Sequence, residues 1–285
     1  MAVSPCYQVQ MLAIEPWNKE REAPYHRSDP NPGFGIKNYE WLPYSVRVED
    51  ARSQRDSFDL DTHGFAFFDD PDGAKPELLQ AVRNIDKEVI ERDYYAAVKS
   101  LVKGITGAER VIIFNHSIRK RDPTEGFFGS PGKQQPGKTI HCDQTPKGAI
   151  RRARQYAGNE VQELLKGRFR IINVWRPINT SVEDWPLALM DGRTLDDANL
   201  HATDLWKHQW EELGSTYNIS FNPDQKWYYL GGHRTDEVTL IKIYDNEPDV
   251  QASLCPHCAF EHPETRPDAP LRESIEVRCL VFGGR

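Results

Sequence analysis

Short runs of apolar and aromatic residues, separated by turn-forming residues, recur along most of this 285-residue chain. Most runs have the length of a β-strand rather than that of a helix. The predicted strands are 62–68, 109–115, 169–175, 217–221, 227–230, 237–244 and 274–282. Strands do not alternate with helices in the way that Rossmann and TIM-barrel folds require. The pattern therefore predicts an α+β fold that is mainly β, with a barrel-like core.

Helices are predicted in two parts of the chain. Residues 76–103 carry apolar side chains at the spacing of one helix face and form the clearest predicted helix. Two shorter helices are predicted at 148–157 and 159–165. We expect these helices to flank the β core rather than to form a core of their own.

The chain length and the absence of internal repeats favour a single domain over residues 1–285. Residues 20–46 are rich in Pro, Gly, Asn and charged residues, which indicates an extended segment that crosses a surface. We therefore expect an extended N-terminal arm over residues 1–60 and a barrel core over about 108–285.

The charge and composition exclude several classes of protein. The formal net charge is −7, which is unlike the basic footprint of a nucleic-acid-binding domain. No run approaches the roughly 18 consecutive apolar residues of a membrane span, and no signal peptide is recognisable. The five cysteines are an odd number, which favours free thiols in a reducing compartment. We expect a cytoplasmic protein that acts on a small molecule and binds neither nucleic acid nor membranes. The sequence does not specify its oligomeric state.

A His-x-Asp pair at the end of a predicted strand is the first candidate for metal binding. On an extended chain, side chains two residues apart point to the same side, so His141 and Asp143 can reach one ion together. A second histidine from elsewhere would complete a facial triad with open positions for other ligands. The pair alone is weak evidence, because such short motifs also occur by chance.

The C-terminal segment supplies that histidine and two arginines. His257 precedes a strand that opens with Arg272 and Ser274, whose side chains share one strand face with Arg278. An arginine fork beside a hydroxyl is well suited to bind a carboxylate. Two arginines on a buried strand require anions, since an unpaired buried charge is costly. The anion is either a bound carboxylate or an acidic residue of the chain, for which the candidates are Glu273, Glu276 and Asp245.

Six blocks of sequence, in order along the chain, match one family. They are 115–119, 141–143, 173–178, 236–238, 256–260 and 272–278. With these blocks the chain resembles the Fe(II)/2-oxoglutarate-dependent oxygenases, and more narrowly the gibberellin-desaturase-like hydroxylase/desaturase family of fungal secondary metabolism. The resemblance implies a double-stranded β-helix, a jelly-roll or cupin-like core, with flanking helices.

The resemblance also implies roles for particular residues. Iron falls to His141, Asp143 and His257, which would be the catalytic residues. The co-substrate positions that it implies are Arg272, Ser274, Arg278 and Asn173. It also implies that the block around His116, residues 115–119, lies beside the metal ligands or the co-substrate. Such an enzyme uses Fe(II), 2-oxoglutarate and O2 to hydroxylate, desaturate or otherwise oxidise a C–H bond of a small secondary metabolite.

Other interpretations of the same residues remain open. His233 could take the place of His257 as the second histidine of the metal site. Cys255 and Cys258 form a C-x-x-C motif, which in another context is the centre of a thiol–disulfide oxidoreductase. The same cysteines, with His257 and His262, could bind zinc, although their spacing is crowded. The chain could also be a non-catalytic binding barrel of the same fold.

Overall fold

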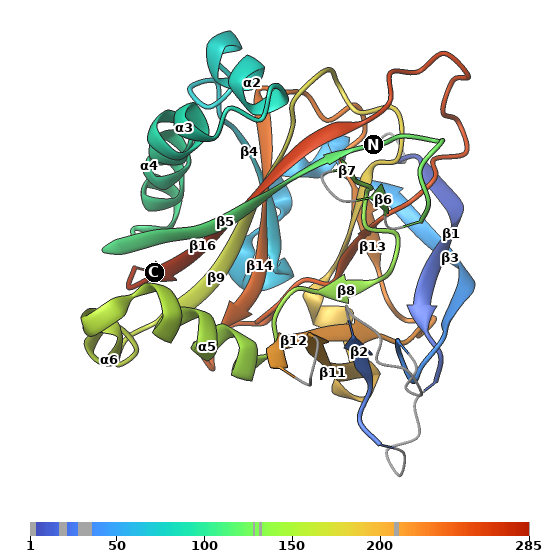
Figure 1. Ribbon diagram of the computed structural model, residues 1–285. Coiled ribbons are helices and arrows are strands. Elements are labelled where there is room, and N and C mark those ends of the chain that lie inside the picture. The colour runs from blue at the N-terminus through green and yellow to red at the C-terminus, as the bar shows by residue number, and fades with distance from the viewer. Residues whose placement is uncertain are drawn as a thin grey trace.

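The computed structural model describes residues 4–16, 22–27, 36–127, 129–130, 133–207 and 211–284. Two β-sheets face each other, and a layer of helices covers the outer side of one of them (Figure 1). This arrangement confirms the predicted fold, which is mainly β with a jelly-roll core and flanking helices. None of the described helices combines the length and the apolar character that crossing a bilayer requires.

The strands of each sheet come from distant parts of the chain. The seven-stranded sheet has the order β4 (Phe65–Asp69), β14 (Glu237–Asp245), β9 (Phe169–Pro177), β16 (Glu273–Phe282), β5 (Arg110–Lys120), β7 (Lys133–Gln134) and β6 (Gly129–Ser130). The nine-stranded sheet has the order β1 (Cys6–Ile14), β3 (Trp41–Asp50), β13 (Trp227–Tyr229), β10 (Leu187–Met190), β15 (His257–Ala259), β8 (His141–Cys142), β12 (Glu211–Ile219), β11 (Leu200–Lys207) and β2 (Tyr25–Arg27).

The two faces of β16 pack against different cores, because successive side chains of a strand point to opposite sides. Ile275 and Val277 join the apolar core under the helices, whereas Leu280 and Phe282 join the core between the two sheets. Ser274, Glu276 and Arg278 alternate with the first of these residues, so they belong to the strand face that points between the sheets. The polar residues of interest thus lie on the inner face of the barrel.

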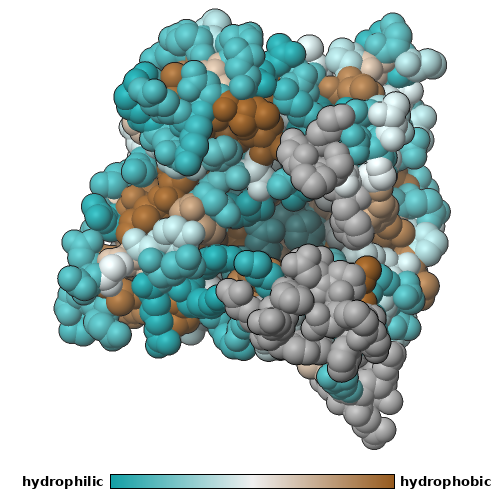
Figure 2. Space-filling view, in the orientation of Figure 1, coloured by the Kyte–Doolittle hydropathy of each residue, from teal (hydrophilic) through white to brown (hydrophobic). Residues whose placement is uncertain are grey.

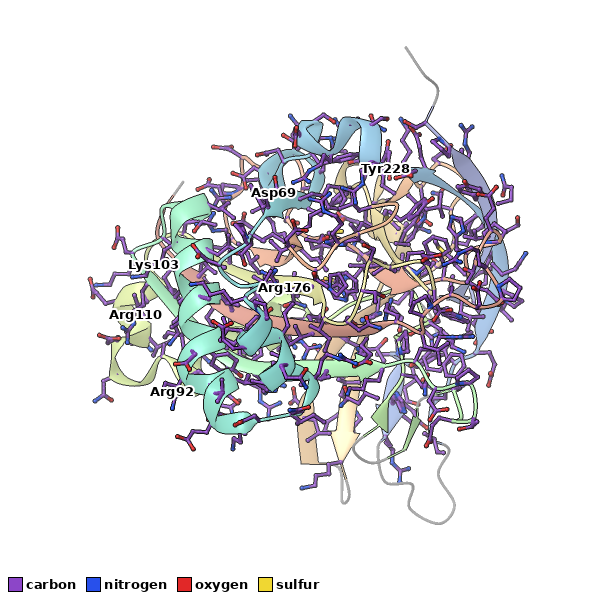
Figure 3. The ribbon with its side chains drawn as sticks, turned by 90° about the horizontal axis from the view of Figure 1, so that it is seen from above. Asp69, Arg92, Lys103, Arg110, Arg176 and Tyr228 are labelled. Atoms are coloured by element: carbon purple, nitrogen blue, oxygen red, sulfur yellow. The ribbon has the colours of Figure 1, made fainter. Side chains whose placement is uncertain are left out.

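The helices are α1 (Leu60–His63), α2 (Pro76–Arg83), α3 (Lys87–Val89), a π-helical turn (Ile90–Tyr94), α4 (Tyr95–Thr106), α5 (Pro146–Tyr156) and α6 (Val161–Leu164), with 3-10 turns at 52–57, 158–160, 192–194 and 197–199. Seen from above, Arg92 and Lys103 project outward from the helical layer (Figure 3). Arg176 is buried and donates from Nε to the Tyr94 hydroxyl at 3.1 Å, and it pairs with Asp70.

The single helix predicted over 76–103 is wrong in one respect, because the chain breaks it into two parts. The first part ends at Arg83, and Ile85 has a φ of 57°, which no helix accommodates. Asp86 then caps a new helix by accepting a hydrogen bond from the Val89 N–H at 3.2 Å. Ile85 matched the apolar pattern, yet its side chain is exposed.

The strand predicted at 62–68 begins later than expected. Asp59 caps the helical turn α1 by accepting from the N–H groups of Asp61 and Thr62, and Gly64 ends it with a φ of 84°. Only then does β4 begin. Two further strands, β10 and β11, lie within residues 180–215, where the polar sequence gave no strand prediction.

The N-terminal segment forms strands of the nine-stranded sheet. β1 pairs with β3 in antiparallel register from Cys6 with Glu49 to Ile14 with Trp41. Leu12 in β1 also bridges Thr139, and its carbonyl accepts from the Ile140 N–H at 2.8 Å. The N-terminal strand therefore lies beside the segment that leads to His141. The parts of the predicted arm at 1–3, 17–21 and 28–35 lie outside the described residues.

Candidate active site

Strand pairing brings the two histidines of the sequence motifs together. β8 and β15 are antiparallel neighbours in which His141 is paired directly with His257, and their ring centroids lie 4.7 Å apart. Asp143 follows β8 immediately. One ligand atom from each of the three residues lies within 4.8 Å of the others. Among the described residues, this is the one group of such side chains that could hold a metal ion.

Main-chain carbonyls orient both imidazole rings. The Nδ1 atom of His141 lies 2.8 Å from the Thr139 carbonyl, and that of His257 lies 3.0 Å from the Cys255 carbonyl. Because a carbonyl oxygen only accepts, each Nδ1 must donate its proton. The Nε2 atom of each ring is then the one with the free lone pair, as in metal sites where the second ring nitrogen is fixed by a hydrogen bond.

The Asp143 carboxylate is held by two donors on its far oxygen. Oδ2 accepts from the Asn173 amide nitrogen and from Arg278 Nε, both at 2.8 Å, while Oδ1 lies 3.4 Å from His141 Nε2. Burial alone would raise the pKa of Asp143, but Arg278 and the two histidines hold it well below its usual range. The carboxylate is therefore ionised at neutral pH and directs Oδ1 toward His141.

Arg278 has its charge matched within the chain. Besides Asp143, it contacts Glu276 at 2.6 Å and donates to the Ser117 hydroxyl at 2.7 Å. The sequence left two roles open for Arg278, a bound carboxylate or acidic residues of the chain, and in the structure its contacts are with the latter. Asn173 likewise contacts Asp143.

Arg272 is in the opposite situation. Its side chain is 3% exposed, and its Nη1 donates to the Trp185 carbonyl at 2.5 Å. Nε is buried with no hydrogen-bond partner, and the guanidinium has no carboxylate partner among the residues that the structure describes. Burial, together with the charge of Arg119, lowers the pKa of Arg272 from 12.5 to about 9. Since it remains charged at neutral pH, Arg272 is a buried cation without an anion.

A small cavity joins the histidines to Arg272. Its volume is about 20 Å³, and its lining includes His141, His257, Arg272, Trp175 and Glu276. This is room for about one water molecule. A larger anion can enter only if side chains of the lining move. Ser274 is 1% exposed and lies two residues from Arg272, at the start of β16.

On the side of Asp143 the group is partly open. The side chains of His141 and Asp143 are 21% and 12% exposed. The face of the molecule in Figure 2 is hollowed over the region of β5 and β8, and the floor of the hollow is hydrophilic. An arrangement with a buried cation at one end and a partly open donor set at the other can admit ligands from solvent.

These residues fit both groups that the sequence motifs implied. Two imidazole nitrogens and one carboxylate oxygen that face one point make up the facial triad of non-haem Fe(II) sites. The unpartnered Nε of buried Arg272 fits a carboxylate, because an unpaired guanidinium in an apolar site is costly. The donor set therefore suits Fe(II), and the far end of the cavity suits an anion.

The competing histidines lie elsewhere. His233 is buried beside the Trp175 ring, with centroids 5.1 Å apart, and is not part of the triad. His116 lies within β5, where its Nδ1 is 2.7 Å from the Tyr95 hydroxyl. His262, the other histidine of the possible zinc motif, is half-buried, with its Nε2 3.0 Å from the Tyr229 hydroxyl.

The two cysteines of the C-x-x-C motif do not form a redox pair. Both are buried and free, and they belong to different apolar cores. Burial raises the pKa of Cys258 to about 12 and that of Cys255 well above its usual value. A redox-active thiol needs a lowered pKa and access to solvent. The environment of these cysteines favours neither a thiol–disulfide centre nor zinc binding.

Two residues of the cavity region were given no individual role by the sequence analysis, although Arg119 lies in the matched block 115–119. Arg119 in β5 lines the cavity with Arg272. Trp185, whose carbonyl receives the Arg272 hydrogen bond, has a φ of 45°, a conformation that is uncommon outside glycine. Arg119 could have been found from the alternation of β5, which places it on the same face as Ser117. No sequence signal marks Trp185.

Comparison with known proteins identifies the family. A family model described as an oxidoreductase/YMDC permease-like domain matches residues 14–282. The Fe(II)/2-oxoglutarate-dependent dioxygenase nvfI of Aspergillus novofumigatus is 45% identical over 97% of this chain and 96% of its own. The hydroxylase/desaturase efuI of Hormonema carpetanum is 32% identical over 83% of both chains.

A solved structure shows the same fold. The structure of the iron and alpha-ketoglutarate-dependent endoperoxidase NvfI superposes with a TM-score of 0.90 at 44% identity, over 98% of this chain and 99% of that one. The chain therefore belongs to the Fe(II)/2-oxoglutarate-dependent dioxygenases, in the group that contains the fungal hydroxylase/desaturases, and is an oxidoreductase that uses Fe(II), 2-oxoglutarate and O2.

Proposed function

We propose that His141, Asp143 and His257 bind the iron of this dioxygenase and are its catalytic residues. The observation that carries this proposal is the pair of main-chain hydrogen bonds that leaves Nε2 of each histidine free, in a group whose ligand atoms lie within 4.8 Å of one another. At the other end of the cavity, Arg272 with Ser274 binds the distal carboxylate of 2-oxoglutarate. The single domain expected over residues 1–285 carries both ends.

Each residue around the ligands has a distinct task in this proposal. When bound, the iron activates O2 at the expense of 2-oxoglutarate. Asn173 and Arg278 hold the far oxygen of Asp143, which keeps the carboxylate ionised and its near oxygen directed to the metal. Arg278 thus acts through Asp143, as a positioning residue. The buried walls of the cavity exclude water from the reacting groups.

The substrate is a small organic molecule of secondary metabolism, acted on in the cytoplasm without nucleic acid or membrane. Four of the five cysteines are buried and all are free, which supports a reducing compartment. Two outcomes are candidates. The names of several relatives favour hydroxylation or desaturation of a C–H bond. The described activity of the superposed structure, an endoperoxidase, favours incorporation of both oxygen atoms of O2.

Turnover under isotopically labelled O2, with the label counted in the product by mass spectrometry, separates these outcomes. A hydroxylated product gains one labelled atom, a desaturated product gains none and loses two hydrogens, and an endoperoxide gains two. The metabolite pool of the host strain, compared with and without the gene, supplies the candidate substrates. Succinate release that requires Fe(II), 2-oxoglutarate and O2 is the expected common result, and its absence with every candidate would contradict a catalytic role.

Iron binding tests the proposed ligands. His257→Ala is expected to lower the affinity for Fe(II) by more than the roughly 10–100-fold that is lost when a residue supporting a metal ligand is replaced. His233→Ala is the matched control, since it removes another buried histidine that lies near the cavity wall. Iron content per folded protein, measured anaerobically, decides the matter. Loss of iron in His233→Ala with full iron in His257→Ala would make His233 the ligand.

A further inference from the structure

Arg119 is the second guanidinium of the cavity, and no role for it follows from the metal triad or from the Arg272–Ser274 pair. We propose that Arg119 is a further binding residue for the distal carboxylate of 2-oxoglutarate, so that two arginines hold this carboxylate from both sides. This inference rests on the proposed function of Arg272 and deepens it.

Strand register places Arg119 at the Arg272 end of the cavity. In the antiparallel pair of β5 and β16, Arg119 is directly opposite Ser274, and Asn115 is opposite Arg278. Residues directly opposite each other lie on the same face, with Cβ atoms about 4.5–5.5 Å apart. Four residues of strand, or about 13 Å, separate Arg119 from the level of Arg278 and Asp143. Arg119 therefore belongs to the end of the cavity that lies away from Asp143.

The two arginines are held in the same way. Nη1 of Arg119 donates to the Gln135 carbonyl at 2.7 Å, as Nη1 of Arg272 donates to the Trp185 carbonyl. The Gln135 side chain is itself fastened, since its Oε1 accepts from the Asp122 N–H and its Nε2 donates to the Asp122 carbonyl. Each guanidinium thus donates from one nitrogen to a main-chain oxygen, and its other nitrogens are available to a ligand.

No acidic side chain neutralises either of them among the described residues. Glu276 lines the same cavity, but it pairs with Arg278 at 2.6 Å. Asp184 pairs with Arg121 at 3.2 Å and otherwise accepts from the main-chain N–H of Arg272. Two like charges in a water-poor cavity repel each other, and a bound carboxylate between them would relieve this repulsion.

The ligand chemistry that fits is a carboxylate on a short chain that reaches the metal. 2-Oxoglutarate has such a group at its far end, and 2-oxopentanoate is the same chain with a methyl group in its place. A residue that binds the distal carboxylate must discriminate between these two molecules. A residue that binds the keto-acid end must affect both equally.

The test is anaerobic calorimetric titration of the Fe(II)-loaded protein with each of the two keto acids. The variants are Arg119→Gln, Arg119→Lys and Arg272→Gln, and the matched control is Arg110→Gln, an exposed arginine of the same strand that pairs with Glu160. Arg119→Gln is expected to lower the affinity for 2-oxoglutarate by about tenfold or more and the affinity for 2-oxopentanoate by less than about twofold. Arg119→Lys, which keeps the charge, should fold even if Gln does not and recover part of the affinity.

Each outcome bears on a separate claim. If Arg119→Gln and Arg119→Lys both bind 2-oxoglutarate like the control, or if Arg119→Gln weakens both keto acids equally, the role of Arg119 at the distal carboxylate is refuted. If Arg272→Gln also leaves the affinity unchanged, the proposed co-substrate site fails as well. If Arg272→Gln loses affinity for 2-oxoglutarate and the Arg119 variants do not, only the role of Arg119 is refuted.

Discussion

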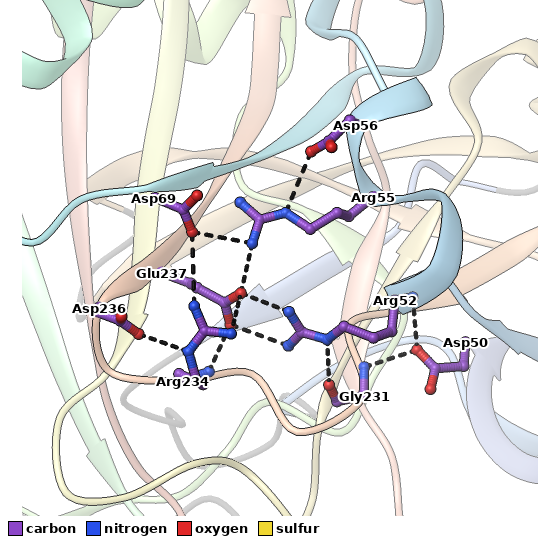
Figure 4. A network of polar contacts seen from close by, with 9 residues as sticks. All are labelled: Asp50, Arg52, Arg55, Asp56, Asp69, Gly231, Arg234, Asp236 and Glu237. Atoms are coloured by element: carbon purple, nitrogen blue, oxygen red, sulfur yellow. Dashed lines mark hydrogen bonds and ion pairs between the residues drawn. The ribbon is translucent and has the colours of Figure 1, made fainter.

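Two groups of arginines in this molecule differ in where their negative charge comes from. In one group, Arg52, Arg55 and Arg234 surround the buried carboxylate of Glu237 (Figure 4), with contacts that include 3.0 Å from Arg52 and 2.6 Å from Arg55. In the other, Arg272 and Arg119 line a cavity and contact main-chain carbonyls but no carboxylate of the described chain.

The pKa shifts of the two groups differ in the same way. Burial would raise the pKa of Glu237, but Arg52, the Arg234 N–H and the neighbouring His233 lower it from 4.5 to about 2. Burial and a neighbouring like charge lower the pKa of Arg272 to about 9. The Glu237 group is complete within the chain and serves to hold the segment 52–57 to β14. The arginines of the cavity are incomplete until an anion binds, which is the physical sign of a ligand site.

Loss of Arg278 should have the largest effect, because it breaks the metal end of the cavity. Arg278→Gln leaves two buried carboxylates, Asp143 and Glu276, without their shared cation. We expect a loss of about 3–5 kcal/mol in the free energy of unfolding of the metal-free protein. Urea unfolding measures it, with Arg110→Gln as the exposed control. A loss below about 1 kcal/mol would mean that the Arg278 pairs are no stronger than surface salt bridges.

Loss of Glu237 should destabilise the fold less and leave the cavity intact. Glu237→Gln leaves three arginines without their carboxylate, but these side chains are 16–48% exposed and can be solvated. We expect a loss of about 1–3 kcal/mol in the free energy of unfolding. Thermal or urea unfolding gives the value. A variant as stable as the parent would show that the network of Figure 4 contributes nothing net.

Acid should remove the Glu237 contribution and sharpen the same comparison. The folded-state pKa of about 2 lies below the unfolded value, so the stabilisation is complete above the unfolded pKa and is lost as pH falls toward 2. The difference in unfolding free energy between the parent and Glu237→Gln should therefore shrink from about pH 5 downward. A difference that stays constant down to pH 3 would contradict the lowered pKa.

Local spacing predicted much of the site but could not assign every residue. The His141-x-Asp143 pair follows from strand periodicity alone, whereas its pairing with His257 depends on a register between distant strands. Arg272, Ser274 and Arg278 share a face by the same periodicity. Periodicity cannot tell that Arg278 faces Asp143 while Arg272 does not, since this depends on which strand lies opposite.

The fold was predictable at the level of strand content and class. The strands that begin at Phe169 and Glu237 are long apolar runs, and the structure contains both close to their predicted bounds. The break near Ile85 was missed because the Asp86 cap competes with a continuous apolar pattern. β10 was missed because its four residues, Leu187–Met190, are stabilised by neighbours from other parts of the chain.

The central claim is that the cavity arginines bind the carboxylate of a ligand, whereas the arginines around Glu237 are neutralised within the chain. One pair of titrations tests this claim most directly. Fe(II)-loaded Arg272→Gln and Glu237→Gln are titrated anaerobically with 2-oxoglutarate at a temperature where both are folded. The loss of a charge-assisted bidentate contact predicts an affinity about 10–100-fold weaker for Arg272→Gln. Glu237→Gln should bind within about twofold of the parent. Unchanged affinity in Arg272→Gln would contradict the account.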